Sequence, residues 1–162
     1  MSILPLTATG SIGLNTLDVI SRHPDQFSVF AASAYSNWKG LLQICNDHLP
    51  SFAVLGDEAS AEKLRRVAPS GVEVLFGKDS LDEIAAHPKT DFVMAAIVGG
   101  AGMSSTFCAA KAGKRIMLAN KESLILGGDL LMNLAENSGA KIIPVDSEHS
   151  AIFQCFEGGR DG

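Results

Sequence analysis

The sequence lacks the features that mark membrane, secreted and nucleic-acid-binding proteins. Its 162 residues contain no apolar run of the roughly 18 to 20 residues that a membrane-spanning helix needs, and its beginning lacks the basic stretch of a secretory signal. Basic residues are in deficit, with 13 Lys and Arg against 18 Asp and Glu, so the net charge of -5 does not attract phosphate backbones or anionic lipids. We therefore expect a cytoplasmic protein with no nucleic-acid or membrane partner.

Cysteine is scarce and widely spaced, at Cys45, Cys108 and Cys155. An odd number without any Cys-x-x-Cys pair is typical neither of a disulfide framework nor of a thiolate metal cluster, so we expect buried apolar residues instead. Charged residues make up only 19% of the chain and apolar residues 46%, which is not the composition of a disordered chain. Length and composition together predict an ordinary domain with a stable core.

Extended apolar runs alternate with helical patterns from end to end. This alternation predicts repeated β-α units, and hence an α/β fold with a mostly parallel sheet and helices on both of its faces. The predicted strands are Ile3–Leu6, Phe27–Ala34, Phe52–Leu55, Val72–Phe76, Asp91–Val98, Arg115–Ala119 and Lys141–Val145. A sheet of this kind binds ligands beyond the carboxyl ends of its strands, so functional residues are expected there.

The segments between the strands carry apolar stripes at helical spacing and residues that begin or end helices. Ser80 with Glu83 predicts a capping box at a helix start, while Gly113 and Gly139 stand where helices would end before the next strand. The two clearest stripes, which we expect to face the core, are Trp38, Leu41, Leu42, Cys45 and Leu49, and then Ala61, Leu64 and Val67.

The first predicted strand runs into Thr7-Ala-Thr-Gly-Ser-Ile-Gly13, a turn that opens a helix. Backbone N–H groups and the helix dipole at such a turn bind anions, and a dinucleotide pyrophosphate fits there. Gly10 would let the backbone approach phosphate and Gly13 would let the helix pack on the strand, but Thr7 stands where the first glycine of the fingerprint is expected. Thr7 tolerates positive φ poorly, and Pro5 removes a donor from the strand. On this motif alone, an ordinary strand-to-helix turn remains an equal alternative.

The second predicted strand ends at Ala34-Tyr-Ser-Asn37, about where an NAD site places an acidic residue on the ribose hydroxyls. No acid is present. Hydroxyls, an amide and nearby Lys39 would instead tolerate a 2′-phosphate, so a bound dinucleotide would be NADP. The alternative is that Ser36 or Asn37 only caps the following helix.

Two later strand ends carry charged residues. Asn120, Lys121 and Glu122 follow the sixth predicted strand in a turn that starts a helix, where a simple cap is the alternative. Asp146 and Glu148 follow the seventh predicted strand. Carboxylate oxygens of this kind suit Mg²⁺ or Mn²⁺ that is also bound by water and substrate. Here too, capping by Asp146 with Glu148 in the first turn is an adequate alternative.

Four blocks, in order and at similar spacing, resemble the 1-deoxy-D-xylulose 5-phosphate reductoisomerases. They are Thr9-Gly-Ser-Ile-Gly13, Met94-Ala-Ala-Ile-Val-Gly99, Leu118-Ala-Asn-Lys-Glu-Ser-Leu124 and Pro144-Val-Asp-Ser-Glu-His-Ser-Ala-Ile-Phe-Gln154, the last two being highly specific. The resemblance covers essentially the whole chain but only the amino-terminal part of that family. It implies a Rossmann-like fold and conversion of the substrate to 2-C-methyl-D-erythritol 4-phosphate with NADPH, in non-mevalonate isoprenoid biosynthesis.

The resemblance also implies roles for individual residues. NADPH would contact Thr9, Gly10, Ser11 and Ile12 at its pyrophosphate, Asn37 at its adenosine phosphate, and Asn120 and Glu122 near the nicotinamide. Asp146 and Glu148 would bind a divalent metal (Mg²⁺, Mn²⁺ or Co²⁺), and Lys121, Ser147 and Glu148 would contact the phosphorylated sugar. Lys121, Asp146 and Glu148 would be the catalytic residues, the metal acting as a Lewis acid.

The resemblance further predicts a division of the chain. Residues 1–145 would form the NADP-binding domain and residues 146–162 the start of a catalytic domain, truncated before the rest of that domain and the carboxy-terminal helical domain. We therefore expect little or no turnover from this chain alone, although full-length members are generally homodimers. Two alternatives are a non-catalytic NADP-binding module and another NAD(P)-dependent dehydrogenase with the same sheet. Thr7, Pro5 and Tyr35-Ser36 depart from the family pattern.

Overall fold

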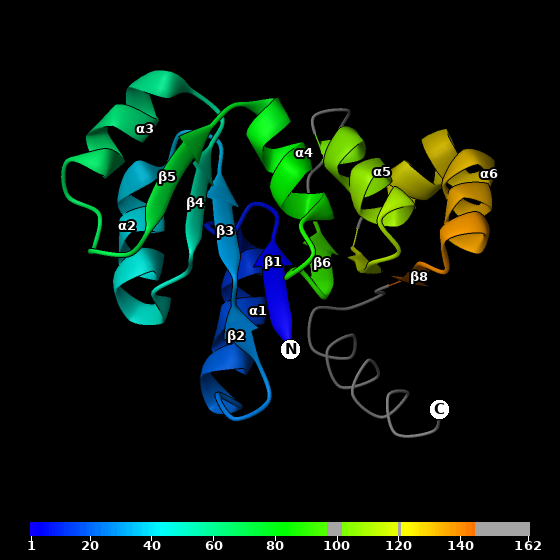
Figure 1. Cartoon of the computed structure of the whole chain (residues 1–162), viewed down its shortest axis with the longest axis horizontal. Coiled ribbons are helices and arrows are strands. Elements are labelled where there is room, and N and C mark those ends of the chain that lie inside the picture. The colour runs from blue at the N-terminus through cyan, green and yellow to red at the C-terminus, as the bar shows by residue number, and fades with distance from the viewer. Residues whose placement is uncertain (97–101, 120, 145–162) are drawn as a thin grey trace.

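Short parallel strands and helices alternate along the chain (Figure 1). The computed structural model describes residues 1–96, 102–119 and 121–144. The strands are β1 (Ser2–Pro5), β2 (Ser28–Val29), β3 (Ala31–Ala34), β4 (Phe52–Leu55), β5 (Glu73–Phe76), β6 (Phe92–Ala95), β7 (Arg115–Leu118) and β8 (Lys141–Pro144). The helices are α1 (Ser11–Arg22), α2 (Trp38–His48), α3 (Glu58–Arg65), α4 (Lys78–Ala86), α5 (Met103–Lys111) and α6 (Lys121–Ser138).

The strands form two hydrogen-bonded sheets that meet where β2 continues into β3, and together they have a doubly wound order with β1 near the centre. Five strands pair in the order β2-β1-β6-β7-β8 and three in the order β3-β4-β5, and the pairings among these strands are parallel. From β1 the chain winds outward through β2 to β5 on one side and through β6 to β8 on the other. The prediction of a Rossmann-like, mostly parallel sheet is confirmed, and such a sheet opens a crevice beside its first strand.

Helices cover both faces of the sheet, and each face has one apolar cluster beneath its helices. The inward residues of α1, α2 and α3, among them Leu17, Leu41 and Leu64, belong to one cluster. Those of α4, α5 and α6, among them Ile84 and Leu131, belong to the other. Figure 1 shows α4, α5 and α6 following one another as a row, in agreement with their mutual contacts. Burial of most of these stripes explains why periodicity located the helices. The prediction is wrong for Leu49 and Val67, which are exposed because α2 and α3 end before these residues reach the core face.

The predicted strand Phe27–Ala34 is divided in two at Phe30, and Pro5 gives the physical reason. Odd-numbered residues of β1 bond toward β2, as when Phe30 donates its N–H to the Ile3 carbonyl at 3.0 Å. The next donor in that ladder would be Pro5, which has none. The Phe30 carbonyl accepts instead from Ser51 at 2.9 Å and from Phe52 at 3.4 Å. The chain therefore leaves β1 at Phe30 and continues as β3 beside β4. Because Ser51 and Phe52 donate to the Phe30 carbonyl, the missing N–H of Pro5 leaves that carbonyl paired.

The residues predicted to begin or end helices do so, with one exception. Gly113 and Gly139 follow α5 and α6 with φ of 71° and 74°, the left-handed conformation expected of glycine after a helix. The capping box of Ser80 and Glu83 is wrong. Gly77 is the N-cap of α4 and no side chain caps it, whereas Ser80 lies inside the helix and donates to the Phe76 carbonyl at 2.9 Å.

The cysteines within the described residues behave largely as expected. Cys45 is fully buried, and burial raises the pKa of its thiol to about 11. Cys108 is only half-buried on α5, and burial raises its thiol pKa as well. Cys155 lies outside the described residues. None of the helices in the described part of the chain combines the length and apolar character needed to cross a bilayer.

Candidate functional site

The turn after β1 is attached to the end of β3 by two hydrogen bonds. Ala8 donates its N–H to the Ser33 carbonyl at 2.6 Å, and Thr7 donates its N–H to the Ser33 hydroxyl at 3.2 Å. Gly10 then donates back to the Thr7 carbonyl at 2.9 Å, which closes the turn. Thr7 has a φ of 58°, a conformation that glycine adopts at little cost. The backbone thus has the shape expected of a glycine at this position, although Thr7 occupies it.

The start of α1 presents backbone donors to the crevice. Gly10 is its N-cap, no side chain caps the helix, and its first turn holds no acidic residue. The first N–H groups of a helix have no partner within it, and the dipole makes that end positive. A Cβ at Gly13 would lie 2.4 Å from the Thr7 carbonyl oxygen and 2.6 Å from the Ala8 Cα, so only glycine fits there. This geometry can bind an anionic group through backbone N–H groups.

The start of α2 lies against this turn. Asn37 is the N-cap of α2, and its Oδ1 accepts the N–H of Gly40 at 3.0 Å. A Cβ at Gly40 would lie 3.1 Å from Thr9 Cγ2, so the structure brings Thr9 and Asn37 to the same place. The capping role considered for Asn37 is confirmed. Lys39 is exposed in the first turn of α2, its Nζ 5.7 Å from the centroid of the Trp38 ring.

A small pocket opens beside the turn, between the ends of β3 and β4 and the start of α4. Its volume is about 150 Å³, and its lining includes Thr7, Tyr35, Leu55, Gly56, Lys78 and Leu81. The side chains around it are mostly apolar, and two glycines, Gly56 and Gly77, contribute backbone surface. It can therefore take a flat apolar group but not a whole dinucleotide, since pockets for drug-sized ligands reach roughly 300 to 1,000 Å³.

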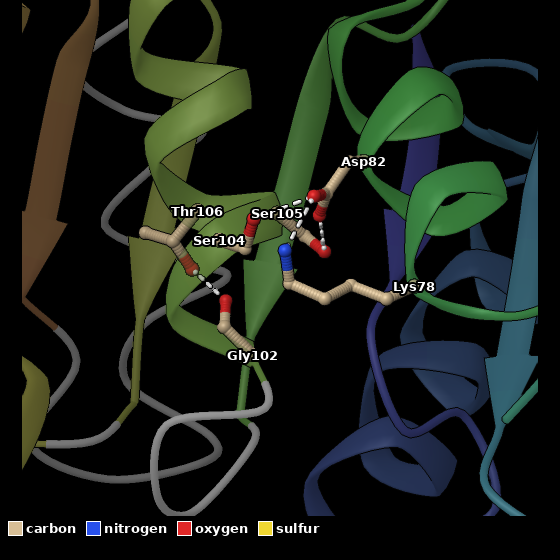
Figure 2. A network of polar contacts seen from close by, with 6 residues as sticks. All are labelled: Lys78, Asp82, Gly102, Ser104, Ser105 and Thr106. Atoms are coloured by element: carbon tan, nitrogen blue, oxygen red, sulfur yellow. Dashed lines mark hydrogen bonds and ion pairs between the residues drawn. The ribbon is translucent and has the colours of Figure 1, made fainter.

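A polar network joins α4 to α5 next to this pocket (Figure 2). Asp82 accepts hydrogen bonds from the hydroxyls of Ser104 at 2.5 Å and Ser105 at 2.7 Å, and Lys78 Nζ lies 3.4 Å from the same carboxylate. Burial raises the pKa of Asp82, but these hydrogen bonds and the Lys78 charge outweigh it and hold the pKa below its usual range. The carboxylate is therefore ionised at neutral pH. Sequence reasoning missed this network, although Lys78 and Asp82 stand at the helical i, i+4 spacing.

Two predicted site residues, Lys121 and Glu122, lie at the other side of the crevice. The carboxyl end of β7 is at the same edge of the sheet as that of β1, because β6 pairs in parallel with both. Lys121 and Glu122 begin α6 there, which confirms a turn that starts a helix; only their backbone is described. The remaining predicted residues, which lie outside the described part of the chain, are Asn120, Asp146, Ser147 and Glu148.

The described residues contain no group of three or more His, Cys, Asp and Glu side chains placed to hold a metal ion. The expected ligands Asp146 and Glu148 are not among these residues. The described part of the site therefore consists of the anion-binding turn, the start of α2 and the small pocket, all on the β3–β4 side of β1 or at its end.

A family model for 1-deoxy-D-xylulose 5-phosphate reductoisomerase matches residues 3–128. The chain belongs to this family. A reductoisomerase of Ruthia magnifica is 56% identical over 161 residues, which are 99% of this chain and 42% of the relative. One of Pseudomonas savastanoi pv. phaseolicola is 51% identical over 156 residues, or 94% of this chain and 39% of the relative. The chain thus spans about two fifths of the length of these curated relatives.

Solved structures of family members have the same fold. The Zymomonas mobilis reductoisomerase in complex with NADPH superposes with a TM-score of 0.85 at 42% identity, over 96% of this chain and 41% of that one. Family membership makes an unrelated NAD(P)-dependent dehydrogenase, the second alternative from the sequence, untenable.

Proposed function

We propose that this chain binds NADPH and forms the cofactor-binding part of a reductoisomerase. The carrying observation is the start of α1, which combines backbone donors, the lack of an acidic residue and a glycine packed tightly against the turn. These residues fit a dinucleotide phosphate on their own chemistry. The complex of the Zymomonas mobilis relative with NADPH supports the same assignment.

In this proposal the cofactor crosses the end of β1. Thr9, Gly10, Ser11 and Ile12 contact the pyrophosphate, with the first N–H groups of α1 as donors. Asn37 and the exposed Lys39 lie on the adenosine side, where a cation suits a 2′-phosphate. Asn120 and Glu122 lie toward the nicotinamide. NADPH supplies the hydride, and the protein positions it.

The reaction proposed for the whole protein is that of the family, conversion of 1-deoxy-D-xylulose 5-phosphate to 2-C-methyl-D-erythritol 4-phosphate. Lys121, Ser147 and Glu148 would contact the phosphorylated sugar, and Asp146 and Glu148 would hold a divalent cation (Mg²⁺, Mn²⁺ or Co²⁺). Lys121, Asp146 and Glu148 are the proposed catalytic residues, Lys121 contributing positive charge beside the substrate oxygens. A relative in complex with NADPH, fosmidomycin and magnesium supports the presence of a metal.

The 162-residue polypeptide itself is proposed to bind NADPH with little or no turnover, as a non-catalytic module would. Residues 1–145 would form the NADP-binding domain and residues 146–162 the start of the catalytic one. We place the protein in the cytoplasm and, at full family length, in a homodimer. Substrate-dependent NADPH oxidation by the 162-residue chain at an ordinary enzymatic rate would refute the proposed lack of turnover.

Isothermal titration with NADPH and NADH tests the cofactor assignment, with Ser11→Asp as the decisive variant. Ser11 is exposed at the first position of α1. A negative side chain there stabilises the helix through its dipole but repels a bound pyrophosphate. We expect wild-type binding that prefers NADPH, and a loss of at least about tenfold in Ser11→Asp without loss of thermal stability.

Ala59→Asp is the matched control, because Ala59 is exposed in the first turn of α3 and the substitution adds the same charge there. It should bind NADPH as the wild type does. If Ser11→Asp binds NADPH as well as Ala59→Asp does, the pyrophosphate does not lie at α1 and the proposal fails.

A further inference from the structure

Asp82 attaches the start of α5 to α4 through both of its carboxylate oxygens (Figure 2). Its Oδ2 accepts the hydroxyl of Ser104 at 2.5 Å, and its Oδ1 accepts that of Ser105 at 2.7 Å. Charge-assisted bonds of this length are among the stronger ones that side chains make. Only 16% of the Asp82 side chain is exposed, against 61% for its ion-pair partner Lys78. The two serine bonds are therefore the part of the network that water weakens least.

These two bonds fix the rotation of α5 as well as its distance from α4. Consecutive residues of a helix point about 100° apart, so Ser104 and Ser105 reach one carboxylate only within a narrow range of rotations about the helix axis. Ser105 is fully buried, although serine is a poor residue for a helix interior. Apolar residues at buried ionic positions often give equal stability, so the particular contribution of this network is the fixed position of the first turn of α5.

The first turn of α5 lies at the edge of the sheet where the cofactor is proposed to bind. Leu6 donates its N–H to the Met94 carbonyl at 3.1 Å, so β1 and β6 end together, and residues 96–102 lead from there into α5. β6 adjoins β1 on the side away from β2, whereas Asn37 follows β3 on the β2 side. A dinucleotide whose adenosine half lies beside α2 must extend its other half over the ends of β6 and β7.

We infer that Asp82 is a positioning residue for the nicotinamide half of the cofactor, acting through the first turn of α5. The inference rests on the proposed function, because the start of α2 and the turn at Thr7 set the direction in which the cofactor extends. Asp82 does not need to touch the cofactor, since both of its oxygens bind serine hydroxyls. Loss of its charge releases the first turn of α5 from α4 and leaves the adenosine half unaffected.

Two ligands separate the halves of the cofactor. 2′,5′-ADP carries the adenosine and its phosphates but no nicotinamide, so its affinity reports on the adenosine half alone. We expect Asp82→Asn to bind NADPH about 3 to 30 times more weakly than the wild type does and to bind 2′,5′-ADP equally well. The fluorescence of the dihydronicotinamide gives an independent signature. At saturating NADPH it should rise on binding to the wild type, where the ring is held, and rise less in Asp82→Asn.

Glu83→Gln is the matched control, because Glu83 is the exposed neighbour of Asp82 on α4 and the substitution removes the same charge. It should bind both ligands as the wild type does. Circular dichroism at the titration temperature establishes that each variant is folded.

Ser104→Ala is a milder variant, because Asp82 keeps its bond to Ser105 and alanine favours the helix. It should weaken NADPH binding in the same sense as Asp82→Asn, but less. If Asp82 acts through Ser104, the double variant should lose less NADPH affinity than the product of the two single losses.

The outcomes separate the inference from the proposed function. If the wild type binds neither NADPH nor 2′,5′-ADP, the proposed function fails and the inference fails with it. If the wild type binds both, three results overturn the inference alone. These are unchanged NADPH affinity and fluorescence in Asp82→Asn, an equal loss of affinity for both ligands, and a wild type that leaves the nicotinamide fluorescence as it is in solution.

Discussion

Replacing Gly13 by alanine should destabilise the protein even though alanine is the better helix former. The added Cβ would lie 2.4 Å from the Thr7 carbonyl oxygen and 2.6 Å from both Cα and O of Ala8. These distances are about 1 Å inside the ordinary contact range of 3.4–4 Å, and all three atoms belong to the backbone. The first turn of α1 must therefore move away from the β1 turn, because no side chain can rotate to make room.

The magnitude follows from two opposing contributions. Overpacking of a close contact costs about 1 to 3 kcal/mol, and occasionally more. The gain in helix propensity from Gly to Ala is at most about 1 kcal/mol. Because all three contacts are with backbone atoms, the upper part of that cost, about 2 to 3 kcal/mol, applies here. Subtracting about 1 kcal/mol of helix propensity leaves a net loss of about 1 to 2 kcal/mol, which corresponds to a fall in melting temperature of roughly 2 to 8 °C for a chain of this size.

Gly128→Ala is the matched control, because Gly128 lies in α6 and a Cβ there meets no atom within 4 Å. It should stabilise the protein by about 0.5 to 1 kcal/mol. Urea unfolding and thermal melting of both variants measure the two effects. A Gly13→Ala protein at least as stable as the wild type would refute the close packing of α1 on the turn.

Three further substitutions test other parts of the structure. Asp82→Asn should lower the free energy of unfolding by about 1 to 3 kcal/mol at neutral pH, because the ionised carboxylate accepts from Ser104 and Ser105. Since the folded pKa of Asp82 lies below its ordinary value of 3.8, that stabilisation is present above 3.8 and is lost as the pH falls through the folded pKa. Leu49→Gly should raise the free energy of unfolding by about 0.5 to 1 kcal/mol, because Leu49 ends α2 with φ of 46° while its side chain is 64% exposed. Asn37→Ala should cost about 0.5 to 2 kcal/mol through loss of the α2 cap, whereas Asn37→Asp should keep the cap and weaken NADPH binding by charge repulsion.

Urea titration measures these effects, at pH 7 and pH 3 for Asp82 and with NADPH titration for Asn37. If the free energy of unfolding differs between wild type and Asp82→Asn by the same amount at pH 7 and pH 3, the lowered pKa of Asp82 is contradicted. A less stable Leu49→Gly would mean that Leu49 contributes contacts that outweigh its backbone strain. Equal NADPH affinity of Asn37→Asp and wild type would place the adenosine phosphate away from α2.

The order and type of the secondary structure could be predicted because they depend on local pattern. Apolar runs and helical stripes report which side of each element is buried, and both faces of this sheet are covered. The division of the strand at Phe30 could not be predicted from the strand itself, because its cause is Pro5 in another strand and Ser51 beyond the next helix. The error at Ser80 has a similar origin, since the pairing of β5 with β4 extends to Phe76 and leaves Gly77 to begin the helix.

The candidate site was predictable where its parts are contiguous in sequence. The turn from Thr7 to Gly13 shows its glycines directly, so its location and the close approach at Gly13 followed from the motif. The pocket could not be predicted from any motif, because the residues around it come from the ends of β3 and β4 and from the start of α4. Tyr35 and Gly56 face each other only once β3 and β4 are paired in register.

The two unusual residues of the first strand and turn, Pro5 and Thr7, act on the same segment. Because Pro5 cannot donate to Phe30, the chain leaves β1 there and continues as β3 beside β4. This path brings Ser33 over the turn, where its hydroxyl and carbonyl accept the N–H groups of Thr7 and Ala8. Those bonds hold Thr7 in the left-handed conformation that its side chain disfavours. The sheet therefore fixes the shape that the fingerprint usually obtains from glycine, and the α1 donors remain directed at the crevice.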